Sequence, residues 1–359
     1  MTHLHHRRAR LAALFLATGA LTTALSSAQA TPSTPATPPA AAATAGAAPA
    51  PKPVTIKVGY LAQLQDVALM TVQDRLKDRQ KVELVRFPRY ADAEAALGRG
   101  DIQLASLGYD VLAGAVARGG AAKFTYVAGL SRGAISLVCR NEVLINGWPD
   151  IKGKRVGVVA GLAEVFIDDA LVQHSLQTTD IERVKFVEKS APALQALREG
   201  AVQCASMPEP LGATAVAEGY AYYPRTDIAD NAYAGINTGL AANPAFLKAN
   251  RGAVQEVVKE VLEASALYQR DKNAWVLELA GAQVTGAASA VGIERVQLDN
   301  KLYMDEAWAL VVAMRPAAPA LATNPPSPAG AAAIAAITKP LPERDAMNAY
   351  FDTSVTEKQ

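Results

Sequence analysis

Short apolar runs and amphipathic stretches alternate twice along the central part of the chain. The runs IKVGYL and VELVRF are typical of strands, and VALMTVQDRLKD between them has apolar residues at helical spacing. The same order returns in KRVGVVAG, VFIDDALVQHSL and VKFVEK. Strands that alternate with helices favour a parallel sheet covered by helices. The pattern therefore predicts two α/β units of the same design.

An internal repeat supports this division. Residues 91–110 align without a gap with residues 191–210, and eight of the twenty positions are identical. The identical pairs are Ala91/Ala191, Ala93/Ala193, Ala96/Ala196, Leu97/Leu197, Gly100/Gly200, Gln103/Gln203, Ala105/Ala205 and Ser106/Ser206. Each copy is expected to supply a helix and the strand that follows it.

Two such units predict a cleft, because ligands of open α/β sheets lie outside the carboxyl ends of the strands. We expect lobe 1 to comprise residues 54–130 and 240–359, and lobe 2 residues 131–239. The chain should cross between the lobes near residues 127–140 and again near 223–239. Two crossings would make a hinge.

The N-terminus predicts export. It has a basic start, an apolar run over residues 11–25, and the small-residue site Ala28-Gln29-Ala30. These are the three parts of a secretory signal peptide, so residues 1–30 are expected to be removed after Ala30. Arg7 and Arg8 also allow export by the twin-arginine route. The expected location is the periplasm.

Two segments rich in Ala and Pro are expected to lack packed structure. Residues 31–53 consist almost wholly of Ala, Pro and Thr, which bury too little apolar area to offset the entropy of ordering. They predict a disordered tether. Residues 315–333 are similar in composition and predict a surface loop, since too little chain follows them to fold alone.

The net charge and the number of histidines argue against nucleic-acid binding, metal binding and histidine-dependent catalysis. Residues 1–30 contain three arginines and no acid, so their removal leaves 32 basic and 34 acidic residues, a formal net charge of −2. This balance gives no electrostatic basis for a nucleic-acid partner. His174 is then the single remaining histidine, which disfavours metal sites and histidine-dependent catalysis. Cys139 and Cys204 could form a disulfide after export or remain buried thiols.

The segment Gly129–Gly133, GLSRG, fits the G-x-S-x-G pattern of serine hydrolases. That pattern requires a sharp turn from strand to helix, whereas the residues after Ser131 are β-rich and His174 lies on a predicted helix of the other unit. We therefore interpret GLSRG as the first crossing, with Ser131 and Arg132 at the cleft. A secreted serine hydrolase remains the alternative from a different class.

Several motifs together resemble a known family. They are IKVGYL, AALGRGDIQLASLG, DIKGKRVGVVAG, ALREGAVQCASMPEP and the closing NAYFDTSV. They resemble periplasmic solute-binding proteins of ABC importers, in the nitrate/sulfonate/taurine branch, also described as the thiamine-pyrimidine-synthesis-like domain. The resemblance implies an α/β fold of the two-lobe, type II-like kind, in which each lobe is a mostly parallel sheet flanked by helices and the ligand lies between the lobes.

The same resemblance implies a binding protein and not an enzyme. The expected ligand is a small anionic or zwitterionic solute, such as a sulfonate, taurine, nitrate or an organic carboxylate. A pyrimidine or other nitrogen heterocycle is the alternative. The expected partner is an ABC permease in the inner membrane. We expect a monomer with no cofactor, no metal and no nucleic-acid partner.

Candidate ligand contacts come from the loops that follow the predicted strands. Residues 160–164 open a helix whose free N–H groups and dipole suit an anion. Arg89 could hold an acidic group with two hydrogen bonds, and a tyrosine offers a ring face and a hydroxyl. Glu209 occupies the Glu-Pro motif of the family and is flanked by prolines. The predicted ligand-binding residues are Tyr60, Gln63, Arg89, Tyr90, Tyr109, Ser131, Arg132, Gly161, Leu162, Glu164 and Glu209.

Overall fold

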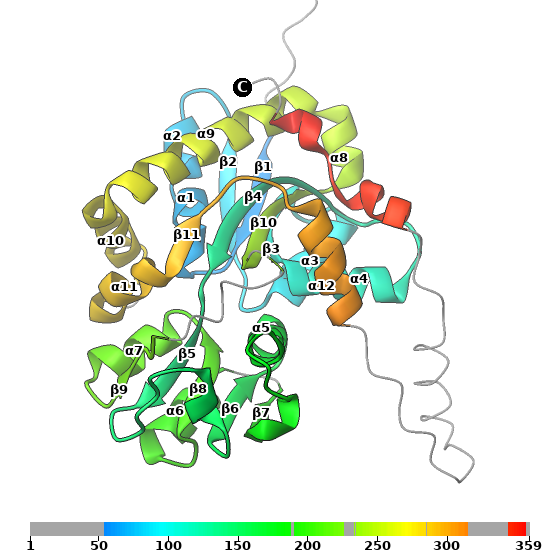
Figure 1. The fold of residues 1–359 in the computed structure, drawn as a ribbon. Coiled ribbons are helices and arrows are strands. Elements are labelled where there is room, and N and C mark those ends of the chain that lie inside the picture. Colours follow the sequence, from blue (N-terminus) through cyan, green and yellow to red (C-terminus); the bar gives the residue numbers. More distant parts are fainter. Residues whose placement is uncertain are drawn as a thin grey trace, which may run out of the picture. The chain divides into compact units, whose positions relative to one another are not determined.

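The computed structural model describes residues 54–187, 190–225, 233, 235–284, 286–314 and 344–356 (Figure 1). The predicted signal peptide (1–30), the predicted tether (31–53) and the predicted loop (315–333) lie outside the described residues. So does most of the segment 226–234 within the predicted second crossing.

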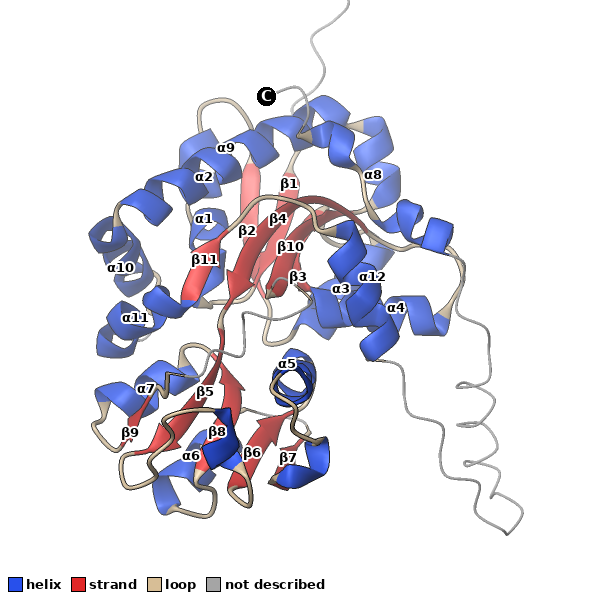
Figure 2. Ribbon diagram, in the orientation of Figure 1, coloured by secondary structure: helices blue, strands red, loops and turns tan. Residues whose placement is uncertain are grey.

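The strands form two sheets, coloured red in Figure 2. One has the order β11-β4-β10-β3-β1-β2 and the other the order β7-β6-β8-β5-β9. We call the first sheet with its helices lobe 1 and the second with its helices lobe 2. The strands of lobe 1 are β1 (Ile56–Tyr60), β2 (Val82–Arg86), β3 (Leu104–Gly108), β4 (Thr125–Gly133), β10 (Ile236–Ala242) and β11 (Val296–Leu298). Those of lobe 2 are β5 (Ile135–Arg140), β6 (Arg155–Val159), β7 (Glu182–Phe186), β8 (Cys204–Pro208) and β9 (Ala221–Tyr222).

Helices connect the strands in both lobes. Lobe 1 has α1 (Val67–Met70), α2 (Val72–Leu76), α3 (Tyr90–Arg99), α4 (Tyr109–Arg118), α8 (Pro244–Ala249), α9 (Arg251–Arg270), α10 (Lys272–Gly281), α11 (Gly286–Gly292) and α12 (Met304–Ala313). Lobe 2 has α5 (Leu162–Gln173), α6 (Ala191–Glu199) and α7 (Leu211–Ala217). Short 3₁₀ helices are η1 (Leu64–Asp66), η2 (Trp148–Ile151), η3 (Thr178–Asp180), η4 (Ile293–Arg295), η5 (Arg344–Tyr350) and η6 (Thr353–Val355).

The predicted α/β class is confirmed, but each sheet is mixed and not mostly parallel. Strand β1 pairs in parallel with β2 and β3, and β6 with β7 and β8. The remaining pairs, which involve β4, β5, β9, β10 and β11, are antiparallel. Strand β5 enters lobe 2 directly from β4, and β10 returns to lobe 1 from lobe 2, so neither strand follows a crossover helix of its own sheet.

The sequence repeat corresponds to a structural repeat. Residues 91–110 contain most of α3 and then β3, and residues 191–210 contain α6 and β8. Gly100 and Gly200 end the two helices with φ values of 82° and 77°. This left-handed conformation suits glycine because it has no Cβ. Leu97 and Leu197 are fully buried, so the repeated residues anchor each helix on its own sheet.

The first crossing between the lobes is a nearly continuous strand. Strand β4 ends at Gly133 in the first sheet and β5 begins at Ile135 in the second. Ala134 between them has φ 58°; its N–H donates to the carbonyl of Arg295 in lobe 1, and its carbonyl accepts from the N–H of Glu209 in lobe 2. The crossing residue is therefore hydrogen-bonded to both lobes.

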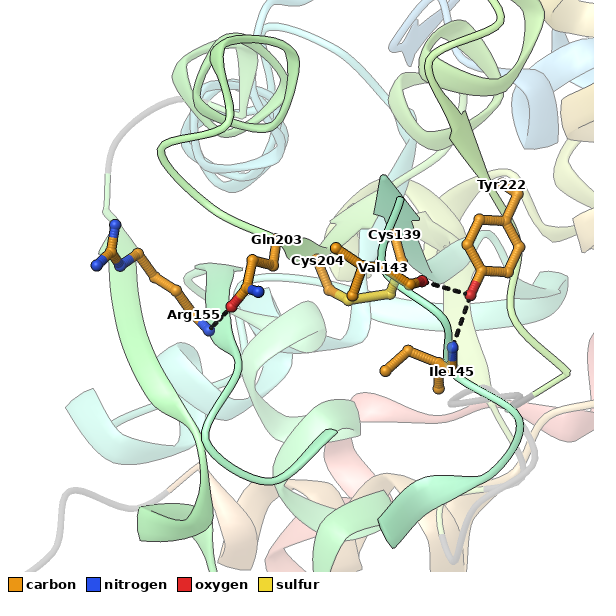
Figure 3. The surroundings of a disulfide bond; sticks show 7 residues. All are labelled: Cys139, Val143, Ile145, Arg155, Gln203, Cys204 and Tyr222. Atoms are coloured by element: carbon orange, nitrogen blue, oxygen red, sulfur yellow. Dashed lines mark hydrogen bonds between the residues drawn. A yellow bond between two sulfur atoms is a disulfide. The ribbon is translucent and has the colours of Figure 1, made fainter. Parts of the chain in front are cut away.

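A disulfide joins Cys139 and Cys204, which face each other in the β5–β8 pair. It resolves the choice between a disulfide and two buried thiols that the sequence left open. Figure 3 shows it between two strand-end contacts: the hydroxyl of Tyr222 donates to the carbonyl of Val143, and the N–H of Arg155 donates to Gln203. The disulfide therefore lies within the sheet of lobe 2, at the end remote from the carboxyl ends of β6 and β8.

Candidate functional site

A cavity of about 1010 Å³ is lined by residues of both lobes. Its wall includes a residue at the carboxyl end of each of the six parallel strands, or within two positions after it: Leu61, Pro88, Asp110, Ala160, Val187 and Pro208. This is the position that open α/β sheets use for ligands. The polar residues of the wall are Gln63, Gln65, Arg89, Tyr90, Asp110, Ser190 and Asn237.

Three neutral side chains form a hydrogen-bonded network on the lobe 1 wall. The hydroxyl of Tyr90 donates to Oε1 of Gln63 at 2.9 Å, and Nε2 of Gln65 donates to the same oxygen. Burial raises the pKa of the Tyr90 hydroxyl, so it stays protonated and can donate. Gln65 is only 3% exposed, and its own Oε1 has no hydrogen-bond partner among the described residues.

The buried carboxyl group of Asp66 holds the loop after β1 in place. Asp66 accepts hydrogen bonds from the N–H of Leu61 at 2.8 Å and from the hydroxyl of Ser106 at 2.7 Å. Burial raises the pKa of Asp66 to about 7, against the effect of these two hydrogen bonds. Because both of its oxygens are used within lobe 1, Asp66 supports the loop and does not line the cavity.

Asp110 brings a carboxylate to the cavity from the first turn of α4. Burial raises the pKa of this carboxyl group, and hydrogen bonds from the backbone N–H groups of Val111 and Asp110 oppose the shift. Its Oδ2 lies 3.3 Å from the point where a Cβ on Gly161 would stand, so the carboxylate approaches the start of α5 in lobe 2. Asp110 therefore spans the space between the walls.

The N-terminus of α5 forms the opposite wall. Gly161 precedes the helix with φ 96°, a conformation that favours glycine. The N–H groups of Glu164 and Val165 both donate to the carbonyl of Gly161. The N–H groups of Leu162 and Ala163 have no acceptor among the described residues, and both residues line the cavity. A helix N-terminus with free N–H groups suits a negatively charged or carbonyl oxygen.

Four of the predicted ligand-binding residues line the cavity: Gln63, Arg89, Tyr90 and Leu162. Gly161 sits between two lining residues, Ala160 and Leu162. The side chain of Arg89 is 70% exposed, and its guanidinium holds both oxygens of Asp92 at 2.9 and 2.8 Å. Arg89 therefore lies at the rim of the cavity with its charge already paired.

Six predicted residues lie elsewhere. Tyr60 is half-buried at the end of β1, and Tyr109 is buried with its ring stacked 4.9 Å from that of Tyr126. Ser131 is buried in β4, with its hydroxyl 2.7 Å from that of Thr238. Arg132 has Asp299 at 3.8 Å. These four side chains, with Glu164 and Glu209 described below, are not part of the cavity wall.

The two predicted acids are held by protein groups. Glu164 forms ion pairs on the surface with Lys185 at 2.5 Å and Arg183 at 3.4 Å. Glu209 is 2% exposed; it accepts from the N–H of Ala213 and from the hydroxyl of Tyr223, both at 2.9 Å. Burial raises the pKa of Glu209, and these hydrogen bonds oppose the shift.

Glu209 lies where the lobes meet on the side of α7 and α11. A Cβ on Gly292 of lobe 1 would stand 3.6 Å from its Oε2, and Arg295 of lobe 1 lies over the ring of Tyr223 at 4.1 Å. The immediate environment of Glu209 is thus made of residues from both lobes. Its geometry is that of an interlobe contact.

Four polar residues of the cavity wall were not among the predicted ligand-binding residues: Gln65, Asp110, Ser190 and Asn237. For Asp110 a signal exists: Tyr109 begins α4, and successive helix residues point about 100° apart. Since the ring of Tyr109 packs against Tyr126, Asp110 is turned toward the cavity. No local signal identifies Asn237, which β10 brings to the wall from far along the chain.

The geometry required of a serine hydrolase is not found at GLSRG. Gly129–Gly133 is the end of strand β4, and Ser131 is 2% exposed. His174 stacks on Trp148 at 5.2 Å, at the end of α5. Within the described ranges, no group of three or more His, Cys, Asp or Glu side chains is placed to hold a metal ion.

Comparison with known proteins identifies the family. The sequence pattern of the NMT1-like family matches residues 49–280. The chain belongs to the NMT1-like family. This match and the structural neighbours below confirm the resemblance seen in the sequence motifs.

Solved structures share the fold of this family member. The periplasmic aliphatic sulphonate binding protein SsuA from Escherichia coli is 23% identical over 72% of this chain and 85% of its own, with a TM-score of 0.62. The alkanesulfonate-binding protein SsuA from Xanthomonas axonopodis pv. citri, bound to MOPS, is 21% identical over 73% and 91%, with a TM-score of 0.58. The periplasmic nitrate-binding protein NrtA from Synechocystis is 12% identical over 83% and 88%, with a TM-score of 0.57.

No curated protein matches the sequence of this family member.

In the part of the chain that the structure describes, no helix combines the length and the apolar character needed to cross a membrane.

Proposed function

We propose that the chain is the periplasmic solute-binding component of an ABC importer, with binding and not catalysis as its task. The observation that carries the proposal is the cavity onto which the parallel strands of both lobes open at their carboxyl ends. Family membership and the fold shared with sulphonate- and nitrate-binding proteins support it. The permease of that importer is the proposed protein partner.

The size and polarity of the cavity fit a small polar solute. A volume of about 1010 Å³ is at the upper end of the range for small-molecule sites. Free N–H groups at α5 suit an acidic or carbonyl oxygen of the solute. Within the anionic or zwitterionic class, we propose contacts with Gln63, Tyr90 and the start of α5, with Arg89 at the rim. A nitrogen heterocycle is the second candidate solute, because the neutral side chains of Gln63, Gln65 and Tyr90 can hydrogen-bond to an uncharged ring.

A thermal-shift screen of the purified chain tests the proposal. The solutes are taurine, alkanesulfonates, nitrate, aromatic carboxylates and aminopyrimidines. A solute at 100 times its Kd should stabilise the folded chain by about 2.7 kcal/mol and so raise its Tm. If no solute in this screen raises the Tm, the proposal is wrong.

A substitution in the cavity wall tests whether the solute that raises the Tm binds in this cavity. Ala160 lines the cavity and is exposed, so the indole ring in Ala160→Trp should occupy solute space without disturbing the core. We expect at least a tenfold loss of affinity. Ala249→Trp places the same ring at an exposed residue at the end of α8 and should bind as the unchanged chain does. Equal affinity in both variants would locate binding elsewhere.

A further inference from the structure

The loop after β5 contains the dipeptide Asn146-Gly147 between two anchored residues. On one side, the N–H of Ile145 donates to the hydroxyl of Tyr222 at 2.9 Å (Figure 3). On the other side, Trp148 begins η2 and is only 5% exposed. Asn146 itself is exposed. The dipeptide is therefore an exposed step between two fixed points of lobe 2.

The two groups of this dipeptide that can react with each other are not held by the protein. The side-chain amide of Asn146 and the backbone N–H of Gly147 have no hydrogen-bond partner among the residues that the structure describes. Asparagine is one of the thermally labile residues. In the whole sequence, Asn146 is the one asparagine that a glycine follows.

The fold does not require a glycine at this position. Gly147 has φ −163° and ψ 170°, an extended conformation that any residue adopts. A Cβ there would meet only Cδ of Pro149, at 3.7 Å, which is an ordinary contact. Because glycine has no side chain, the nitrogen of Gly147 is open to the approach of Cγ of Asn146.

Asn141 in the same loop provides a comparison within the chain. It is exposed like Asn146, but its Nδ2 donates to the carbonyl of Gly219 at 2.8 Å, and Glu142 follows it in place of a glycine. This hydrogen bond has to break before the amide of Asn141 can react. The two asparagines therefore share exposure and differ in the features that favour reaction.

We propose that Asn146 is a site of spontaneous deamidation. The nitrogen of Gly147 attacks Cγ of Asn146, so an N–C bond forms, the bond from Cγ to Nδ2 breaks, and ammonia leaves with the proton of the Gly147 amide. Water then opens the succinimide ring at either carbonyl. Opening at Cγ leaves aspartate, and opening at the backbone carbonyl leaves isoaspartate, in which the main chain runs through Cγ.

The isoaspartate product weakens the attachment of η2 to lobe 2. Its main chain is longer by a methylene group between the anchors at Ile145 and Trp148. Both products also place a second negative charge beside Asp150, whose Oδ2 accepts from the N–H of Asn146 at 2.9 Å. Asn146→Asp reproduces the added charge without the added length.

Peptide mass spectrometry of the purified chain, aged near neutral pH at physiological temperature, tests the proposal. Fragmentation that distinguishes isoaspartate from aspartate identifies the route, since isoaspartate forms only through the succinimide. We expect both products at Asn146, and loss of the amide at least tenfold slower at Asn141. Equal rates at the two residues, or aspartate without isoaspartate at Asn146, overturn the proposal.

Gly147→Ala tests the contribution of the glycine. The added methyl group hinders the attack without straining the backbone, so loss of the Asn146 amide should slow at least tenfold. Gly252→Ala makes the same change at an exposed residue of α9 with open space around it, and should leave the rate unchanged. An unchanged rate in Gly147→Ala overturns the proposal.

Urea denaturation tests the effect on η2. Ion exchange separates the deamidated fraction of the aged chain by its added negative charge. This fraction contains isoaspartate, so its denaturation midpoint should be lower than that of Asn146→Asp; equal midpoints overturn the weakened attachment of η2. None of these measurements uses a solute, so their outcome is independent of the proposed function.

Discussion

The two lobes share an arrangement of strands and helices but differ in the loops that follow β1 in lobe 1 and β6 in lobe 2. Ser106 and Ser206 are equivalent residues of the repeat, and both are fully buried. Ser106 donates to the carboxylate of Asp66, which closes the lobe 1 loop from within. Ser206 donates to the carbonyl of Ala163 in the first turn of α5, and Leu162 and Ala163 of this turn line the cavity.

Different residues determine the fold of each lobe and the groups that line the cavity. Positions that are identical in the repeat, such as Leu97/Leu197 and Gln103/Gln203, fix the helices and strands of each lobe. Positions that differ determine the polar groups of each wall: the side chains of Gln63 and Tyr90 from lobe 1, and the first turn of α5 from lobe 2. A site that needs both kinds of group can therefore be built from two copies of one frame.

The largest expected effect concerns a difference in the core. Position 204 is a disulfide-bonded cysteine in lobe 2, and the equivalent Leu104 in lobe 1 is an ordinary buried residue. The double variant Cys139→Ala with Cys204→Ala should lose about 4 kcal/mol of unfolding free energy, since the disulfide closes a loop of 65 residues. Urea denaturation measures the loss.

A reductant serves as the control for this variant. It should lower the denaturation midpoint of the unchanged chain and leave that of the double variant where it is. A midpoint of the unchanged chain that does not respond to reduction would show that the disulfide adds no stability to lobe 2.

The second prediction concerns the buried acid of lobe 1. The pKa of Asp66 is raised by burial to about 7, so above pH 4 the folded chain holds a proton that the unfolded chain has released. Stability due to this group is therefore full below pH 4 and is lost as the pH rises toward 7. Compared with Asp66→Asn, the unchanged chain should lose up to about 1.4 kcal/mol per pH unit in this range.

Urea denaturation at pH 4, 5, 6, 7 and 8 measures both chains, and the difference between them isolates Asp66 from the other carboxyl groups. Asparagine can still accept from the N–H of Leu61 and donate to the hydroxyl of Ser106. Parallel stability curves for the two chains would contradict the assignment of a raised pKa to Asp66.

Gln103 and Gln203 occupy equivalent positions of the repeat and make the same contact in each lobe. The side chain of Gln103 accepts from the N–H of Lys57 at 2.8 Å, and that of Gln203 accepts from the N–H of Arg155 at 2.9 Å. Gln103→Ala and Gln203→Ala should each cost about 1 kcal/mol. Gln173→Ala, at an exposed residue of α5, should stay within about 0.5 kcal/mol of the unchanged chain. Losses that differ by more than a factor of three would show that the two frames are not energetically equivalent.

The parallel strands and the helices that follow them could be predicted from the sequence, because each of these elements has its own hydrophobic pattern. Apolar runs, helical spacing and the repeat located the parallel strands and the α3–β3 and α6–β8 units. The helix expected over 67–78 is divided at Thr71 into α1 and α2. The antiparallel strands were not predicted, since their direction follows from how the chain passes between the lobes.

The predicted residues that line the cavity all lie in loops or helix starts within four positions after a parallel strand. Gln63, Arg89, Tyr90 and Leu162 come from such loops and line the cavity. Glu209 also follows a strand, but Gly292 and Arg295, more than eighty positions later in the sequence, contribute to its surroundings. Contacts of that range leave no local pattern, so whether a strand-end residue faces the cavity or another element could not be decided from the sequence.

The position of β10 has a consequence for the order in which the sheets can be completed. All strands of the lobe 2 sheet lie within residues 135–222, whereas the lobe 1 sheet needs β10 (Ile236–Ala242) between β3 and β4. During synthesis from the N-terminus, the whole lobe 2 sheet can therefore form before β10 has been made. Until then the edges of β3 and β4 that face β10 have unpaired backbone N–H and C=O groups, which are prone to pairing with other chains. Lobe 1 contains the first strand to be synthesised, and yet its sheet is the last to be completed.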